Sequence, residues 1–67
     1  MPDYKPLEWL KAYRETAGLT QLQVAKKAKI HRGYYSMIES GHRSPGLKLA
    51  KRLGIILNFD WTLFFNQ

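Results

Sequence analysis

Residues that begin and end helices recur along this chain at short intervals, and this punctuation constrains its fold most strongly. Proline, hydroxyl and carboxyl residues favour a helix start, whereas glycine favours a helix end. Such residues stand at Pro6, Gly18, Thr20, Gly41, Ser44, Pro45 and Asp60. They predict five helices, over about residues 6–17, 21–28, 32–40, 45–57 and 61–65. No strand-like alternation is sustained, so we expect an all-α bundle with short connections.

The second and third predicted helices are separated by a turn of about three residues. Thr20, followed three residues later by Gln23, forms a capping-box pattern at the start of the second helix. Within that helix we expect Leu22 and Ala25 to face inward. A connection this short between two helices suits a helix-turn-helix arrangement.

Length and composition limit the number of domains and the kinds of site. A chain of 67 residues has room for one core, so we expect residues 1–67 to form a single domain. It contains no cysteine, which excludes disulfides and thiolate metal sites. No apolar stretch approaches the length needed to span a bilayer, and the N-terminus does not resemble a signal peptide. We therefore expect a soluble, intracellular protein without a membrane contact.

The net charge of +6 is concentrated in the middle of the chain. Residues 21–52 contain eight basic residues and one acid, whereas the flanks together are nearly neutral. The eight are Lys26, Lys27, Lys29, Arg32, Arg43, Lys48, Lys51 and Arg52. A cationic middle is the expected footprint of a surface that binds a polyanion, although a merely solvated basic face has the same pattern. Lys48, Lys51 and Arg52 are expected to face solvent.

Residues 32–40 separate into two unlike faces when they are placed at helical steps. Tyr35, Ile38 and Glu39 fall together and are expected to face the core. The opposite face holds Gly33, Ser36, Met37 and Ser40. That face has neither a large aliphatic ridge nor an acid, so it could lie in the major groove of DNA without repelling phosphates. A plain solvated face is the alternative, but such faces usually carry Glu and Lys.

Two charged residues fall on otherwise apolar helix faces, Arg14 in the first helix and Glu39 in the third. A partly buried single charge is costly, whereas an arginine–carboxylate pair satisfies both groups through parallel hydrogen bonds. We predict that Arg14 pairs with Glu39 and fixes the third helix against the first. This role is architectural and not catalytic.

From residue 7 to residue 65 the chain resembles the Cro/phage-repressor (XRE-like) helix-turn-helix family, whose motif residues occur here in order and at matching spacing. They are Arg14, Gly18-Leu19-Thr20-Gln21, Val24-Ala25, Ile30, Ile38-Glu39-Ser40-Gly41, Arg43, Pro45, Leu57 and Phe59-Asp60-Trp61. The resemblance implies a five-helix, lambda-repressor-like DNA-binding domain that regulates transcription. Repression is the implied sign, and a phage or mobile element the implied origin.

We also predict an assembly and a location for this protein. A homodimer would bind an inverted repeat, with two recognition helices in successive major grooves about 34–36 Å apart. Double-stranded DNA is then the main partner, and the protein would work in the cytoplasm at the bacterial nucleoid.

The resemblance assigns roles to individual residues as well. The residues that would face base edges are Arg32, Gly33, Tyr34, Ser36 and Met37, with Arg32 the candidate for bidentate contact to guanine. The residues that would contact the DNA backbone are Gln21, His42, Arg43 and Ser44. The family's pairing of arginine with glutamate falls on Arg14 and Glu39, as helical periodicity had indicated.

Three features depart from the family pattern. Lys29 stands where the family commonly has glycine, at a cost of about 1 kcal/mol if its backbone is left-handed. Gly33 adds no side-chain contact and Met37 only an apolar one, which leaves more of the recognition to DNA shape. Gly54 replaces the usual alanine, which weakens the fourth helix but permits a close helix approach.

The C-terminal third carries more apolar residues than one helix face can bury, and these are candidates for a dimer contact. They are Leu49, Ile55, Ile56, Trp61, Phe64 and Phe65. The three aromatic residues more often seal a core than form an interface, whereas Leu49, Ile55 and Ile56 lie off the inner face. The aromatic surface would also serve the alternative function, a protein-interaction module such as an antitoxin that binds a partner protein.

No arrangement of side chains in the sequence indicates catalysis or a bound ligand. The five acids and two histidines assemble no acid–base pair, nucleophile or metal site. His31 suits a helix cap, and His31 with His42 lack the carboxylate or thiol partners of a metal site. We expect no enzyme activity, no cofactor, no metal and no small-molecule ligand. RNA binding is possible from charge, but there is no sheet platform for stacking single strands.

Overall fold

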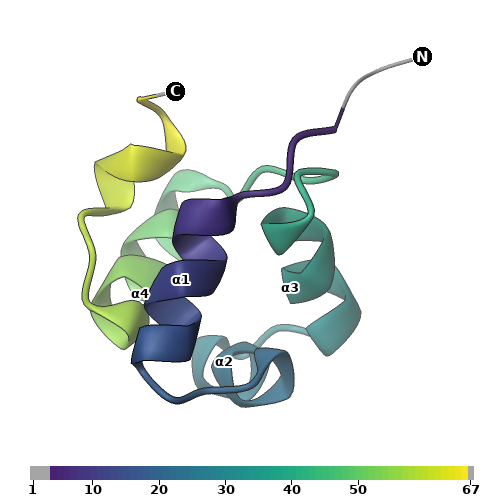
Figure 1. Ribbon diagram of the computed structural model, residues 1–67, viewed down its shortest axis with the longest axis vertical. Coiled ribbons are helices and arrows are strands. Elements are labelled where there is room, and N and C mark those ends of the chain that lie inside the picture. The colour runs from purple at the N-terminus through teal and green to yellow at the C-terminus, as the bar shows by residue number, and fades with distance from the viewer. Residues whose placement is uncertain (1–3, 67) are drawn as a thin grey trace.

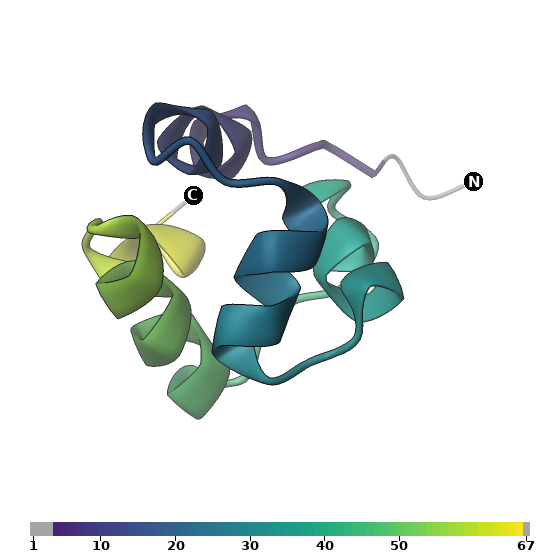
Figure 2. The same ribbon diagram turned by 90° about the horizontal axis from the view of Figure 1, so that it is seen from below.

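Four α-helices and a short 3₁₀ helix follow one another in the computed structural model, which describes residues 4–66 (Figure 1). They are α1 (Glu8–Thr16), α2 (Gln21–Ala28), α3 (Arg32–Glu39), α4 (Leu47–Leu57) and the 3₁₀ helix η1 (Trp61–Phe64). Helix α2 lies in the middle, with α3 on one side and α4 on the other (Figure 2). None of the described helices has the length and apolar character that crossing a bilayer requires.

The all-α prediction is confirmed, but the fifth predicted helix is not an α-helix. Residues 61–64 form a single 3₁₀ turn, closed by backbone hydrogen bonds from Leu63 to Asp60 (3.0 Å) and from Phe65 to Thr62 (2.9 Å). Asp60 caps this turn as predicted, because its Oδ1 accepts hydrogen bonds from the amide and the hydroxyl of Thr62. So short a segment satisfies its backbone with the tighter 3₁₀ pattern.

Close backbone approach holds η1 against α4. A Cβ on Gly54 would lie 2.8 Å from the carbonyl oxygen of Phe59 and 3.3 Å from Cβ of Trp61, so a side chain at this position would push η1 away. The Nζ of Lys51 lies 5.2 Å from the centre of the Trp61 ring, a cation–π contact that adds to the same packing. The predicted close approach at Gly54 is therefore made by the C-terminal turn.

Two helices begin two residues later than predicted. Helix α1 begins at Glu8 and not at Pro6, since the Leu7 amide donates to the Glu39 carbonyl (2.8 Å). Helix α4 begins at Leu47 with Gly46 as its N-cap, while Pro45 is buried. At their ends, α1 and α3 each stop one residue earlier than predicted.

The core is formed by eight residues from all four α-helices. They are Leu10, Val24, Ala25, Ala28, Tyr35, Ile38, Leu53 and Leu57. Ala25 faces the core, as predicted. The same prediction is wrong for Leu22, which is 48% exposed, because Val24 is the residue of α2 that turns inward in its place. Leu47, at the first turn of α4, is 55% exposed and is not among the residues that pack on the core.

Both ends of α2 are satisfied by side chains. At its start the predicted capping box is present, since Gln23 N–H donates to Thr20 Oγ1 (3.1 Å) and Thr20 N–H to Gln23 Oε1 (2.8 Å). At its end Nη1 of Arg52 donates to the carbonyl oxygen of Ala28 (2.8 Å). Arg52 is exposed, as expected, but it also makes this contact. Its guanidinium satisfies a carbonyl that the helix end leaves unpaired.

Lys29 adopts the left-handed backbone, with φ 58° and ψ 44°, at the turn between α2 and α3. Lys29→Gly should raise the free energy of unfolding by about 1 kcal/mol, because glycine lacks the Cβ that makes this conformation costly. The matched control is Lys27→Gly inside α2, which should lower it by up to about 1 kcal/mol. Denaturant unfolding measures both. Equal destabilisation by the two changes would show that no strain resides at Lys29.

Candidate nucleic-acid interface

Helix α3 turns one face into the core and leaves the other accessible. Tyr35 and Ile38 are fully buried, whereas Arg32, Gly33 and Met37 are exposed. The two remaining predicted base-reading residues, Tyr34 and Ser36, are half-buried, and the Tyr34 ring packs against the core. The accessible face thus carries one cation at its start and small or apolar groups along its length.

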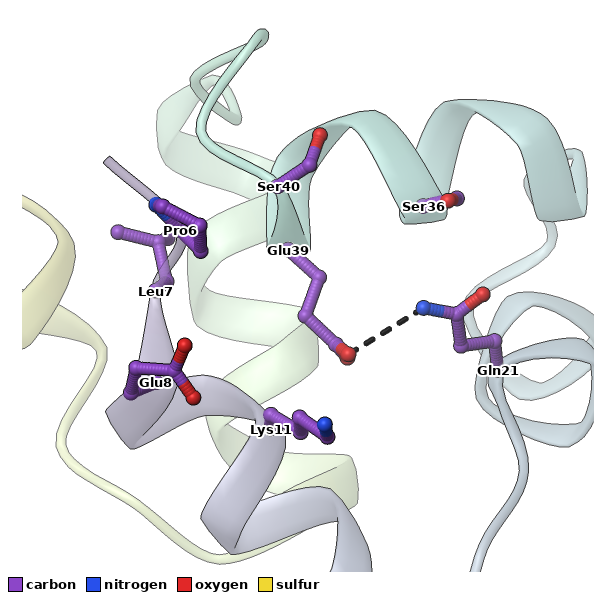
Figure 3. A pocket seen from close by; sticks show the side chains of 8 residues that line it. All are labelled: Pro6, Leu7, Glu8, Lys11, Gln21, Ser36, Glu39 and Ser40. Carbon is purple, nitrogen blue, oxygen red and sulfur yellow. Dashed lines mark hydrogen bonds between the residues drawn. The ribbon is translucent and has the colours of Figure 1, made fainter. Parts of the chain in front are cut away.

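Gln21 lies beside α3, where α2 begins. Its side-chain Nε2 donates to Glu39 Oε1 at 3.2 Å. Gln21, Ser36 and Ser40 line the same hollow of about 200 Å³ (Figure 3). The fold thereby brings the first turn of α2 next to the accessible side of α3, as contact to one stretch of DNA backbone requires.

The loop after α3 folds back over the C-terminal end of that helix. The amides of His42 and Arg43 both donate to the carbonyl oxygen of Met37, at 2.9 and 3.2 Å. Ser40 Oγ contacts the same carbonyl (3.1 Å) and His42 Nδ1 (2.8 Å). The side chains of His42, Arg43 and Ser44 are exposed. The three predicted backbone-contacting residues therefore follow directly on the accessible face of α3.

Arg14 and Glu39 pair as predicted, with both side chains largely buried. Nε of Arg14 lies 2.9 Å from Oε2 of Glu39, and Nη2 lies 3.1 Å from Oε1. The remaining terminal nitrogen of Arg14 donates to the carbonyl oxygen of Leu19 (2.9 Å). The pair is bidentate, which fixes both the distance and the orientation of α3 relative to α1.

Opposing effects set the ionisation of Glu39. Burial by itself would raise the pKa of this carboxyl, but the hydrogen bonds from Arg14 and Gln21 outweigh burial and hold the pKa below its ordinary value. The buried Tyr35 hydroxyl lies beside the same carboxylate, with no partner at hydrogen-bond geometry among the described residues. Burial, and then the charge of Glu39, raise the pKa of that phenol. Glu39 is therefore ionised and Tyr35 neutral at physiological pH.

Lys11 is a residue of this site that the sequence reasoning missed. Its side chain borders the hollow that Gln21, Ser36 and Glu39 also line (Figure 3). Lys11 stands three residues before Arg14, so both lie on one side of α1. The three-residue spacing between Lys11 and Arg14 was the feature of the sequence that could have identified Lys11. The described residues contain no group of three acidic, histidine or cysteine side chains placed to hold a metal ion.

The Arg14–Glu39 pair predicts a large effect of removing one charge. Glu39→Gln should lower the free energy of unfolding by about 3 kcal/mol, because it leaves the Arg14 guanidinium largely buried without its counter-charge. Glu15→Gln, on the exposed surface of α1, is the matched control and should change it by less than about 0.5 kcal/mol. Denaturant unfolding at neutral pH measures both, and equal small effects would contradict the structural role of the pair.

The lowered pKa of Glu39 also predicts an acid-dependent loss of stability. As the pH falls below the ordinary value of 4.5, the unfolded chain takes up a proton before the folded protein does, so the stabilisation present above that pH is lost. Thermal unfolding from about pH 7 to about pH 3 should show this decline, and Glu39→Gln should make it shallower. Asp60 should add to the decline, because hydrogen bonds from the amide and the hydroxyl of Thr62 lower its pKa as well. Parallel pH profiles for the two proteins would refute the contribution of Glu39.

Known proteins resemble this chain in sequence and in fold. Residues 10–64 match the helix-turn-helix family. An uncharacterized HTH-type transcriptional regulator of Bacillus subtilis (strain 168), YqaF, is 52% identical over 60 residues, which are 90% of this chain and 79% of that protein.

Two solved structures of SinR show the same fold. SinR, described as the master regulator for biofilm formation, superposes in its complex with DNA at a TM-score of 0.77, with 22% identity over 88% of this chain and 95% of that one. The SinR–SinI complex superposes at a TM-score of 0.78, with 21% identity over 90% of this chain and 59% of that one. The resemblance to Cro/phage-repressor proteins is confirmed, and this chain belongs to the helix-turn-helix family.

Proposed function

We propose that this protein binds duplex DNA in a sequence-specific manner and regulates transcription, with α3 as the recognition helix in the major groove. One observation carries the proposal. The outward face of α3, with Arg32, Gly33 and Met37 exposed, is uncovered by any other described element, and the only acid of the helix, Glu39, is buried and paired. Such a face can approach base edges without repelling phosphates.

Residues beside α3 support the proposed docking. Gln21 at the start of α2 shares a hollow with Ser36 and Ser40, and the exposed loop residues His42, Arg43 and Ser44 follow the end of α3, so both groups would contact the DNA backbone. The relative YqaF is described as a transcriptional regulator, and SinR, which shares this fold, was solved in complex with DNA. Occupancy of an operator that overlaps a promoter excludes polymerase, so repression is the proposed mode of regulation. The cytoplasm is the proposed location.

A homodimer on an inverted repeat is part of the proposal, and two of its six candidate contact residues are well exposed. Ile55 is 83% exposed and Phe65 is 53% exposed. The other four candidates are at least half-buried on their own protomer: Leu49, Ile56, Trp61 and Phe64. Ile55 and Phe65 are therefore the residues with apolar surface left for a second copy.

Selection of bound duplexes from a random pool, at near-physiological salt, tests the proposed function. A palindromic consensus would support specific binding, and the spacing of its half-sites would report the dimer geometry. If no sequence is enriched, sequence-specific binding is refuted, and a protein-interaction role takes its place.

Two substitutions separate base reading from backbone contact. Arg32→Ala should reduce the preference for the selected duplex over a mixed-sequence duplex by about 1–3 kcal/mol, because it removes the candidate guanine contact. Gln21→Ala should weaken both duplexes by the same factor. Anisotropy titrations measure the affinities, and thermal unfolding verifies that each variant is folded. Unchanged binding by both variants would refute the docking orientation.

The proposed dimer surface predicts an effect that depends on the DNA site. Ile55→Ser should weaken binding to a full palindrome while leaving binding to a single half-site unchanged, because it removes apolar surface from the dimer contact alone. Leu47→Ser is the control on α4, since Leu47 is also exposed (55%) but lies at the other end of the helix. Equal behaviour of the two variants on the palindrome would exclude Ile55 from the dimer contact.

A further inference from the structure

The residues before α1 are seated on the loop that follows α3 (Figure 1). The ring of Tyr4 stacks on the ring of His42, with centroids 4.0 Å apart and an angle of 26° between the planes. The Leu7 amide donates to the carbonyl oxygen of Glu39. Residues 4–7, here called the N-terminal segment, thus run beside the loop that is proposed to contact the DNA backbone.

The loop presents a fixed seat for this segment. The His42 ring is held at its edge by Ser40 Oγ, 2.8 Å from Nδ1, and its backbone amide is bonded to the carbonyl of Met37. Tyr4 therefore stacks on a ring that is already positioned. Because stacking against a fixed ring is favourable, the contact can order a short segment.

Gly41 allows the segment to approach. Its φ of 86° is left-handed, and a Cβ built there would collide with the backbone carbonyl of Lys5. Only glycine both adopts a left-handed backbone at little cost and leaves room for the Lys5 carbonyl. Glycine at position 41 therefore allows the backbone of the N-terminal segment to lie directly against the loop.

The seat carries positive charge. The N-terminal segment and the loop together border a hollow of about 260 Å³. It is lined by Lys5, Leu7, Gly41, Arg43, Ser44, Pro45 and Phe64. Among these described lining residues there are two cations and a hydroxyl but no acid. Cations, a hydroxyl group and backbone amides are the groups that contact phosphate oxygens in protein–DNA interfaces.

We propose that the N-terminal segment is part of the DNA interface, in which Tyr4, stacked on His42, positions Lys5 beside Arg43 so that both cations contact backbone phosphates. The inference rests on the proposed function and extends it to residues outside the helix-turn-helix. Lys5 contributes affinity and not base specificity. Tyr4 is a positioning residue that acts through the stack.

The charge of Lys5 is tested by the salt dependence of binding. Lys5→Gln should lower the affinity for the selected duplex and for a mixed-sequence duplex by the same factor. It should also reduce the slope of log affinity against log salt by about 0.9, the value for one phosphate contact. Lys48→Gln removes the same charge from α4, on the other side of α2 from α3 (Figure 2), and should leave the slope unchanged.

The stack is tested by substitutions that remove no charge. Tyr4→Ala should lower affinity and the salt slope as Lys5→Gln does, because Lys5 is no longer positioned. Tyr4→Phe keeps the stacked ring and should bind like the unaltered protein. Circular dichroism at the temperature of the titrations should show all three variants folded, which excludes a general loss of fold. Only Tyr4→Ala should unfold at a somewhat lower temperature, because it alone loses the stack. If Tyr4→Ala binds normally while Lys5→Gln does not, the positioning role of Tyr4 is overturned.

Arg43→Gln separates this inference from the proposed function. If Arg43→Gln lowers the salt slope but Lys5→Gln does not, the loop contacts DNA and the N-terminal segment does not, which overturns the inference alone. If the unaltered protein binds neither duplex, the proposed function fails and the inference fails with it. Parallel loss in Arg43→Gln, Lys5→Gln and Tyr4→Ala supports both.

Discussion

The interaction on which the rest of this structure depends is the pairing of Arg14 with Glu39. A carboxylate at the buried side of α3 requires a counter-charge, and Arg14 supplies it with two parallel hydrogen bonds. The same guanidinium bonds the carbonyl of Leu19, and the same carboxylate accepts from Gln21. One ion pair thereby sets the position of α1, of the start of α2 and of α3. It is also what places Gln21 beside the accessible face of α3.

Contacts between elements, more than helix propensity, stabilise helices this short. The Arg52 guanidinium satisfies a carbonyl at the end of α2, and the amide of Leu7 closes on the last turn of α3. Lys29 keeps a left-handed backbone because the packing of α2 on α3 over-determines the turn. In a chain of 67 residues the core is small, so each satisfied helix end carries a large share of the net stability.

The composition of the accessible face of α3 has a consequence for the proposed DNA recognition. With Gly33 and Met37 at its centre, the face offers few hydrogen-bonding groups to base edges. In the proposed complex, affinity would then rest on contacts to the DNA backbone from Gln21, from the loop after α3 and from the N-terminal segment. Binding of this kind depends strongly on salt, and much of its selectivity comes from the shape and deformability of DNA.

The sequence by itself determined the all-α class, the order of the helices and the capping box at Thr20, because caps and helical periodicity are local properties that adjacent residues specify. It also indicated the pairing of Arg14 with Glu39, although they stand 25 positions apart, because each is a charge on an otherwise apolar helix face and requires an opposite charge. Tertiary structure alone decided that Leu22 faces outward, that Arg52 reaches Ala28 and that Tyr4 stacks on His42. The last two contacts join residues more than twenty positions apart, and Leu22 is placed by how α2 packs between α3 and α4. No local pattern records such contacts, because they arise only when the helices pack.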